Sequence, residues 1–185
     1  MDDEFIDIID ENGIIVGQTT RQVAFMEGIL HPAVNIILVN SKGEIYIQQR
    51  SINKAAFPLY WDTSVGEHVM RGESFRKAAF RGLEEELSVI GVSIKLIRGG
   101  HIQKSEYKRN NRLIKDYEFV KLYLAFSEKI PKINHQEIRQ GKFISLRKIS
   151  NMLENNDKKV KFTPWGRDEL RYILQNLKSV KRLTH

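Results

Sequence analysis

Carboxylate and guanidinium side chains gather between Gly66 and Val89 of this 185-residue chain. Arg81 is followed four residues later by Glu85 and then by Glu86, and Glu73 precedes it. Hard oxygen ligands of this kind suit Mg²⁺, which needs only one or two protein carboxylates because it keeps several waters. A bound divalent ion lowers the pKa of a water ligand. The stretch therefore predicts a site for a divalent metal ion.

The same stretch has the pattern of a glycine-bearing turn followed by an amphipathic helix. Ser74 is a candidate N-cap, because a serine hydroxyl can accept a hydrogen bond from an N–H group of the first helical turn. Helical spacing predicts one packed face for five apolar side chains: Phe75, Ala78, Ala79, Leu83 and Leu87. Glu86 falls at the edge of this face, where a carboxylate is costly unless it meets a cation or a metal.

Residues 66–89 resemble the sequence box of the Nudix hydrolases. We take Gly66 as its opening glycine, and the other matches are Glu73, Arg81, Leu83, Glu85, Glu86 and Val89. Three positions depart from the pattern: Gly82 replaces a glutamate, Ser88 replaces a glycine, and Glu67 stands at a position that is often glycine. The resemblance implies an α+β fold, a Nudix-type α/β/α sandwich in which a mixed β-sheet lies between helices.

The resemblance also implies a role for each matching residue. Glu85 and Glu86 would bind Mg²⁺, with Mn²⁺ as a further possibility. Glu73 and the carbonyl group of Gly66 would support the metal site, and Arg81 would orient the carboxylates as an ion-pair partner of Glu85.

Gly82 deprives the box of a side chain that helps to activate water or bind metal in other members. A glycine within a helix costs about 1 kcal/mol relative to alanine, so close backbone packing or room for a substrate would have to favour it. Family members often supply a further carboxylate from a later strand. Strand alternation puts Asp116 and Glu118 on one face. Glu118 is our candidate base and Asp116 the second, with two solvent-facing residues as an equal alternative.

More of the chain resembles the branch of the family that contains isopentenyl-diphosphate isomerases, over residues 29–33, 47–51, 54–62, 66–69 and 162–165. Those isomerases hold a metal with residues that match His31, His68, Asp116 and Glu118. They also need a cysteine as proton donor just before His68, and this chain has none; a further histidine ligand is replaced near Ala24. Isomerase activity is therefore not expected. His68 is a candidate metal ligand or, equally, a turn residue, whereas His31 is expected to be structural.

Four residues outside the box are candidates for substrate binding: Arg50, Trp61, Lys104 and Arg109. Trp61 could stack on a base or cover an apolar tail, although an aromatic residue after a proline more often packs into the core. Lys104 and Arg109 belong to a polar, basic segment, residues 104–112, which we expect to be a loop that meets phosphates or, equally, a solvated loop.

The composition of the chain narrows the classes of protein and of partner that it fits. The net charge of +7 fits an anionic partner such as a nucleotide or, with weaker support, RNA. Because the chain has no cysteine, disulfides and thiolate metal sites are excluded and a cytoplasmic location is the default. No apolar run approaches the roughly 18 residues of a membrane span, and the acidic start Met-Asp-Asp-Glu is unlike a secretory signal.

The pattern predicts one domain over residues 1–185: an N-terminal hairpin and short helix (1–30), a core (31–150) that contains the box, and a C-terminal helical region (151–185). Strands are expected at 4–10, 14–17, 35–40, 44–50, 93–103, 113–126 and 142–145, and helices at about 20–28, 74–88, 146–155 and 163–178. Residues 35–40 and 44–50, joined by Asn-Ser-Lys-Gly, form the best hairpin pattern.

These observations together predict a metal-dependent Nudix hydrolase that cleaves the diphosphate linkage of a nucleoside diphosphate linked to another moiety. The alternative is a non-catalytic module that binds nucleotides or RNA, with Gly82 marking the lost chemistry. An isomerase is the third reading. The N-terminal hairpin could lie at a homodimer interface. The box does not specify the substrate, because selectivity resides in loops that vary between members.

Overall fold

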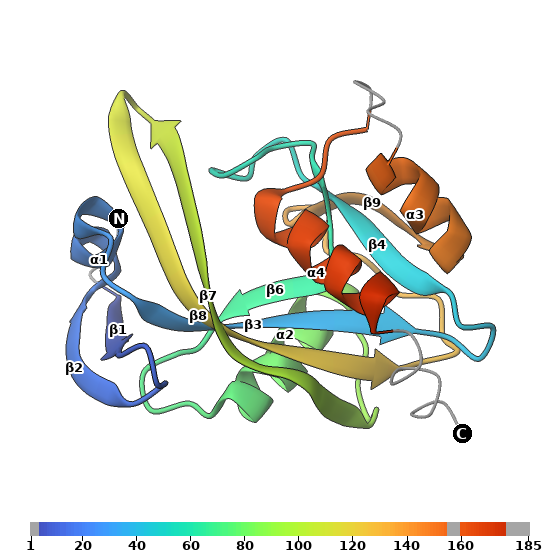
Figure 1. The fold of residues 1–185 in the computed structure, drawn as a ribbon, viewed down its shortest axis with the longest axis horizontal. Helices are drawn as coiled ribbons and strands as arrows, with labels where there is room; N and C mark the ends of the chain where they lie inside the picture. The colour runs from blue at the N-terminus through green and yellow to red at the C-terminus, as the bar shows by residue number, and fades with distance from the viewer. Residues whose placement is uncertain (1–3, 155–159, 177–185) are drawn as a thin grey trace.

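The computed structural model describes residues 4–154 and 160–176, which form a mixed β-sheet with helices on both faces (Figure 1). The strands are β1 (Phe5–Ile9), β2 (Ile15–Thr20), β3 (His31–Val39), β4 (Ile45–Arg50), β5 (Trp61–Asp62), β6 (Val65–His68), β7 (Ile94–Arg109), β8 (Arg112–Phe126) and β9 (Ile138–Ile144). The helices are α1 (Arg21–Glu27), α2 (Phe75–Leu87), α3 (Leu146–Glu154) and α4 (Pro164–Gln175). The predicted α+β class and mixed sheet are confirmed.

Strand β3 is the centre of the sheet, and every one of its residues is buried. It pairs in parallel with β8 and antiparallel with β6, but it meets β4 only where Val39 lies opposite Ile45. The expected hairpin of residues 35–40 and 44–50 is present as an antiparallel pair, but its pairing is short, because β4 diverges to pair with β5 and β9. A strand covered on both faces is apolar at nearly every position, as residues 36–39 are.

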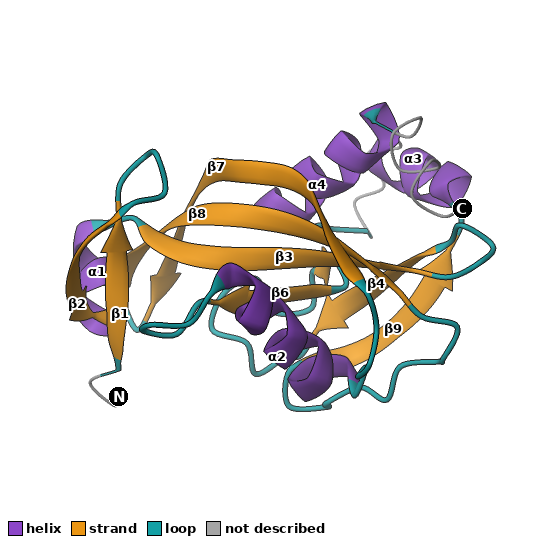
Figure 2. Cartoon of the chain, turned by 90° about the horizontal axis from the view of Figure 1, so that it is seen from below, coloured by secondary structure: helices purple, strands orange, loops and turns teal. Residues whose placement is uncertain are grey.

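The two faces of β3 pack against different helices (Figure 2). Val34, Ile36 and Leu38 share a core with α2, whereas Ile37 and Val39 share a second core with α3 and α4. The packed face predicted for α2 is confirmed by the fully buried side chains of Ala78, Ala79, Leu83 and Leu87. The predicted N-cap is also present, since the Ser74 hydroxyl accepts a hydrogen bond from the backbone N–H of Lys77.

Strands β7 and β8 form a long hairpin whose distal part projects from the sheet (Figure 1). We call this distal part, residues 103–118, the arm. The loop expected at residues 104–112 is wrong, because both strands continue through it to a turn at Asn110 and Asn111. These two residues have positive φ values of 48° and 60°, which a tight two-residue hairpin turn requires and which asparagine tolerates.

The ends of the described chain agree with the sequence pattern in most respects. The expected N-terminal hairpin and short helix are present, with Thr20 as N-cap of α1 and Gly28 in the left-handed conformation after it. Helix α4 has Thr163 as N-cap, but its expected end near residue 178 lies outside the described residues. Helix α3 begins at Leu146, as the helix expected at 146–155 predicts. No helix of the described residues is long and apolar enough to cross a membrane.

Candidate active site

A cavity of about 750 Å³ lies where β3, β6, the start of α1, the end of α2 and the arm come together. Its lining contains both signs of charge. The carboxylates from the box are Glu67, Glu85 and Glu86. The cations are Arg21, Arg50, Lys54 and Arg109. A cavity with this lining can hold a metal ion and a polyanion together, because each neutralises part of the charge of the other.

Arg81 ties the loop of the box to its helix. Its guanidinium group lies 3.0 Å from Glu73, 3.3 Å from Glu67 and 3.4 Å from Glu85. It also donates a hydrogen bond of 2.7 Å to the backbone carbonyl of His68. The carboxylate of Glu73 accepts a further hydrogen bond from the loop backbone, so it is occupied by these contacts and does not line the cavity.

Glu86 is the most enclosed carboxylate of the box, with only 7% of the residue exposed. Gln48 Nε2 donates a hydrogen bond of 2.9 Å to its Oε2 atom. Burial raises the pKa of Glu86 to about 8, although Lys54 and the hydrogen bond from Gln48 oppose the rise. Glu85 differs, because about half of its side chain is exposed and it pairs with Arg81. The two predicted metal ligands therefore have very different surroundings.

Gly82 is where α2 makes its close approach to β6. A Cβ atom at this position would lie 2.9 Å from Val65 Cγ1 and 3.2 Å from Glu67 Cβ. Of the two reasons considered for a glycine here, close backbone packing is the one that this geometry favours. A side chain at this position would require the side chains of Val65 and Glu67 to shift.

Position 66 needs a correction in the alignment to the box. The family pattern places five residues between its first glycine and its glutamate, so counting back from Glu73 puts that glycine at Glu67. Gly66 is thus one residue out of register, although it does line the cavity. Glu67 is a carboxylate that the sequence analysis missed. Its Oε1 atom accepts a hydrogen bond of 3.0 Å from the backbone N–H of His68.

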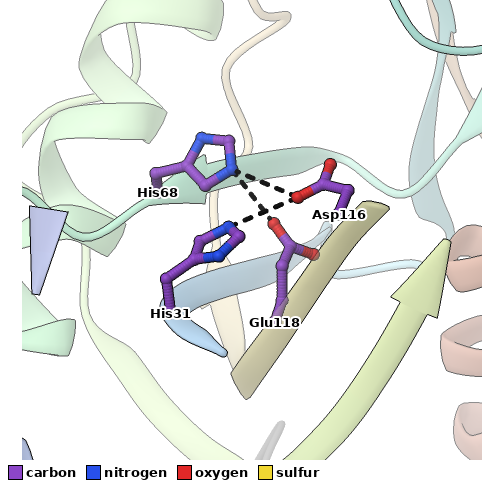
Figure 3. Close-up of side chains that lie close together, drawn as sticks. All are labelled: His31, His68, Asp116 and Glu118. Carbon is purple, nitrogen blue, oxygen red and sulfur yellow. Dashed lines mark ion pairs between the residues drawn. The ribbon is translucent and has the colours of Figure 1, made fainter. Parts of the chain in front are cut away.

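Four further side chains converge beside the cavity: His31, His68, Asp116 and Glu118, which we call the histidine cluster (Figure 3). All of them except His31 line the cavity. His31 Nε2 lies 3.3 Å from Asp116 Oδ1. His68 Nε2 lies 3.2 Å from Glu118 Oε1 and 4.0 Å from Asp116 Oδ1. One ligand atom from each residue lies within 4.8 Å of the others.

The register of the sheet brings this cluster together. Glu118 lies opposite His31 in the parallel pair of β3 and β8, and His68 lies opposite Ala33 in the antiparallel pair of β3 and β6. Asp116 and Glu118 project from one face of β8, as strand alternation predicts. His31, which was expected to be structural, lies within the cluster, and whether it has a structural or a metal-binding role stays a prediction.

The donor atoms of the cluster fit a divalent metal ion. Among the described residues, His31 Nε2, His68 Nε2 and Asp116 Oδ1 are buried without a hydrogen-bond partner. His31 Nδ1 lies 3.0 Å from the carbonyl oxygen of Ile29, and donation to that oxygen leaves the Nε2 lone pair directed at the cluster. Two imidazoles and two carboxylates suit Zn²⁺ or Mn²⁺.

Arg21 lies at the other ring nitrogen of His68. Its Nη2 atom is 3.0 Å from Nδ1, and a guanidinium group can only donate. Nδ1 therefore accepts while Arg21 is in place. Burial opposes a charge on His68, but Asp116 and Glu118 outweigh it and raise the pKa of His68 to about 9. Both the charged ring and a ring bound to metal through Nε2 carry a proton on Nδ1, so in either state Arg21 must turn away.

The candidates for substrate binding divide into two groups. Arg50 and Arg109 line the cavity, and Arg50 is held by Asp62 at 3.1 Å. Trp61 does not reach the cavity: it is 9% exposed and packs into the core. Lys104 also lies outside the lining, with its Nζ atom 5.0 Å from the ring centre of a neighbouring tyrosine.

Three aromatic residues that line the cavity were missed: Phe25, Tyr107 and Trp165. Trp165 follows the N-cap of α4, and its Nε1 atom donates a hydrogen bond of 3.0 Å to Asp62. Tyr107 lies on the arm, in a segment that was expected to be a loop. Trp165 had been noted within the matching residues 162–165, but only the packing of α4 against β5 shows that it reaches the cavity.

Comparison with known proteins agrees with this geometry. The NUDIX domain profile matches residues 29–166. An isopentenyl-diphosphate Delta-isomerase of Photorhabdus laumondii is 32% identical over 176 residues, which cover 94% of this chain and 96% of that protein. An uncharacterized Nudix hydrolase of Nostoc sp. is 42% identical over 87 residues, which cover 46% of this chain and 52% of that protein.

Solved structures show the same fold. The DR0079 protein of Deinococcus radiodurans has a TM-score of 0.70 at 24% identity, with 91% of this chain and 98% of that chain covered. The NUDIX domain of NrtR from Shewanella oneidensis, solved in complex with ADP ribose, has a TM-score of 0.56 at 14% identity, with 80% and 87% covered. The profile match spans most of the chain and contains the whole box, and the chain therefore belongs to the Nudix family.

Proposed function

We propose that this protein is a metal-dependent hydrolase that cleaves the diphosphate linkage of a nucleoside diphosphate linked to another moiety. The observation that supports this most is the shared cavity of Glu86 and the cations Arg50, Lys54 and Arg109. Carboxylates alone would repel a diphosphate, and cations alone would bind it without activating water. The neighbour solved with ADP ribose supports a nucleotide-like ligand.

Each part of the cavity has a distinct task in this proposal. A bound divalent ion would neutralise phosphate charge and lower the pKa of a water. Glu85 and Glu86 supply its oxygen ligands, and Glu67 lies beside them. Arg81 holds Glu85 and Glu67 in place through its ion pairs.

The remaining lining residues would bind the substrate and accept the proton. Arg50 and Arg109, which line the cavity, would contact phosphate oxygens, and Trp165 and Tyr107 would offer ring faces to the attached groups. Glu118 remains the candidate base, because it lines the cavity and the box has no side chain at position 82.

The test is the release of phosphate and nucleotide with Mg²⁺ or Mn²⁺, against a chelator. The panel contains nucleoside triphosphates, ADP-ribose, dinucleoside polyphosphates and capped RNA. Glu86→Gln should lower metal-dependent turnover by about a hundredfold or more, since it removes a ligand charge. The matched control is Glu84→Gln, on the exposed part of the same helix, which should keep the activity. Full activity of Glu86→Gln would contradict the metal assignment.

An isomerase acting on isopentenyl diphosphate is the second candidate. The histidine cluster and the relative from Photorhabdus laumondii favour it. Against it, the resemblance requires a cysteine just before His68, and Gly66 and Glu67 stand there in a chain without cysteine. Isomerisation of isopentenyl diphosphate without phosphate release would overturn the hydrolase proposal. Binding without any turnover would favour the non-catalytic module.

The single domain, the homodimer, RNA as a partner and the cytoplasmic location stay predictions. Mg²⁺ is the proposed ion at the box, and Mn²⁺ suits both the box and the histidine cluster.

A further inference from the structure

The side-chain amide of Asn35 has a fixed orientation at the wall of the cavity. Its Nδ2 atom lies 3.3 Å from Gln103 Oε1 and 3.4 Å from Glu169 Oε1. A carboxylate paired with a guanidinium can only accept hydrogen bonds. The nitrogen of the amide must therefore face Glu169, and Oδ1 is the end that remains for other partners.

Glu169 is held from several sides by donors. It lies on α4 and is fully buried, with Arg98 Nη1 3.3 Å from its Oε2 atom. His101 Nε2 and Gln103 Nε2 each lie 2.9 Å from its Oε1 atom. If the Asn35 amide reversed, its Oδ1 would meet the carboxylate oxygen, and the hydrogen bond would be replaced by repulsion between two acceptors. This network therefore fixes which end of the amide faces the cavity.

Gly66 leaves room for the oxygen of this amide. Asn35 and Gly66 are partners in the register of β3 and β6, so side chains at both positions would project on the same side. A Cβ atom at residue 66 would lie 3.1 Å from Asn35 Oδ1, which is a tight contact. Both residues line the cavity, and no donor of the described residues forms a hydrogen bond with Oδ1.

We propose that Asn35 is a specificity-determining residue whose Oδ1 atom accepts a hydrogen bond from an N–H or O–H group of the ligand. Glu169 is its positioning residue, because it prevents the amide from offering a donor instead. A ligand with a carbonyl group at the same place would put its oxygen against Asn35 Oδ1. Because both atoms are acceptors, they repel each other and the ligand binds more weakly. The inference rests on the proposed function only in that the ligand occupies this cavity.

The experiment compares ligands that differ in one donor. ADP-ribose against inosine diphosphate ribose exchanges an amine for a carbonyl group, and ADP against 2′-deoxy-ADP removes a hydroxyl group. Dissociation constants are measured by calorimetry in chelator, so that no turnover is needed. In the native protein the donor-bearing member of at least one pair should bind about tenfold more tightly.

Two variants test the orientation of the amide. The glutamine side chain of Glu169→Gln can donate as well as accept, so the Asn35 amide can reverse. The ligand preference should then fall toward equal binding, because the carbonyl-bearing ligand binds more tightly than it does to the native protein. Asn35→Ala should remove the preference while the three other donors of Glu169 stay in place. It keeps the test decisive if Glu169→Gln does not fold.

Asp168→Asn is the matched control. It removes the ion pair of Arg98 with the exposed Asp168, outside the cavity lining, and leaves the pair of Arg98 with Glu169 in place. It should leave the ligand preference unchanged. If Glu169 had only a structural role, its variant would weaken both members of a pair equally. That result, or equal binding of every pair by the native protein, would overturn the proposal. A failure of the hydrolase proposal is distinct, because it appears as the absence of metal-dependent product release.

Discussion

Arg21 Nη2 lies 3.0 Å from His68 Nδ1, at the ring nitrogen that does not face the carboxylates of Asp116 and Glu118. His68 can therefore accept from Arg21 only while its proton is on Nε2, inside the histidine cluster. Coordination of a metal through Nε2 requires the opposite arrangement. Arg21, in the first turn of α1, therefore stabilises the tautomer of His68 that cannot bind a metal ion through Nε2.

Arg21→Gln should strengthen metal binding at the histidine cluster by about three- to tenfold, because a glutamine amide can accept from Nδ1–H and carries no charge. Calorimetric titration with Zn²⁺ and with Mn²⁺ measures the effect. His31→Ala identifies the part of the signal that belongs to the cluster, and Lys42→Gln, in an exposed turn, controls for net charge. Unchanged or weaker binding in Arg21→Gln would show that the guanidinium does not compete.

Glu86 makes stability depend on pH in the metal-free protein. Burial raises its pKa from 4.5 to about 8, so the folded protein keeps a proton that the unfolded chain releases. Stability is therefore lost as the pH rises from about 4.5 to about 8. The glutamine of Glu86→Gln cannot titrate. As the pH rises through this range, the free energy of unfolding of the variant should therefore increase relative to that of the native protein.

Urea unfolding in chelator at several pH values measures this difference. Added Mg²⁺ should reduce it, because a bound cation stabilises the charged carboxylate of Glu86. Two curves that stay parallel between pH 5 and 8 would show that Glu86 titrates normally.

Gly82→Ala should destabilise the protein by about 1–3 kcal/mol, because the added methyl group meets Val65 and Glu67 at 2.9 and 3.2 Å. At an open helical position the same change would stabilise by about 1 kcal/mol. Glu84→Ala, on the same helix and exposed, should change stability by no more than about 0.5 kcal/mol. A gain in the urea midpoint of Gly82→Ala would mean that α2 and β6 are less closely packed than described.

Ser88→Gly should stabilise the protein by about 0.5–1 kcal/mol. Ser88 ends α2 in the left-handed conformation, with φ 53° and ψ 33°, where glycine has no Cβ penalty. Thermal unfolding measures the gain, and Ser88→Ala, which keeps a Cβ atom, should show none. Equal melting temperatures for the glycine and alanine variants would show that the left-handed backbone conformation of Ser88 is not strained.

Residue order along the chain was enough to predict the helix of the box and the pairing of its charged side chains. The cap at Ser74, the buried face of α2 and the spacing from Arg81 to Glu85 depend on contacts within one or two helical turns, which spacing specifies directly. Residues 104–112 of the arm were mistaken for a loop because their charged side chains conceal the alternation typical of a strand. The family profile agrees with the box, since both depend on order along the chain.

Which residues far apart in the sequence meet depends on the packing of the whole fold. His31 joins Glu118 because β3 and β8 pair in parallel at one register, and a shift by one residue would turn either side chain to the other face. Asn35 meets Glu169 because α4 packs on the face of the sheet opposite α2. Such contacts depend on strand partners and helix placement, which residue spacing does not encode, because they are chosen by the burial of apolar surface over the whole fold.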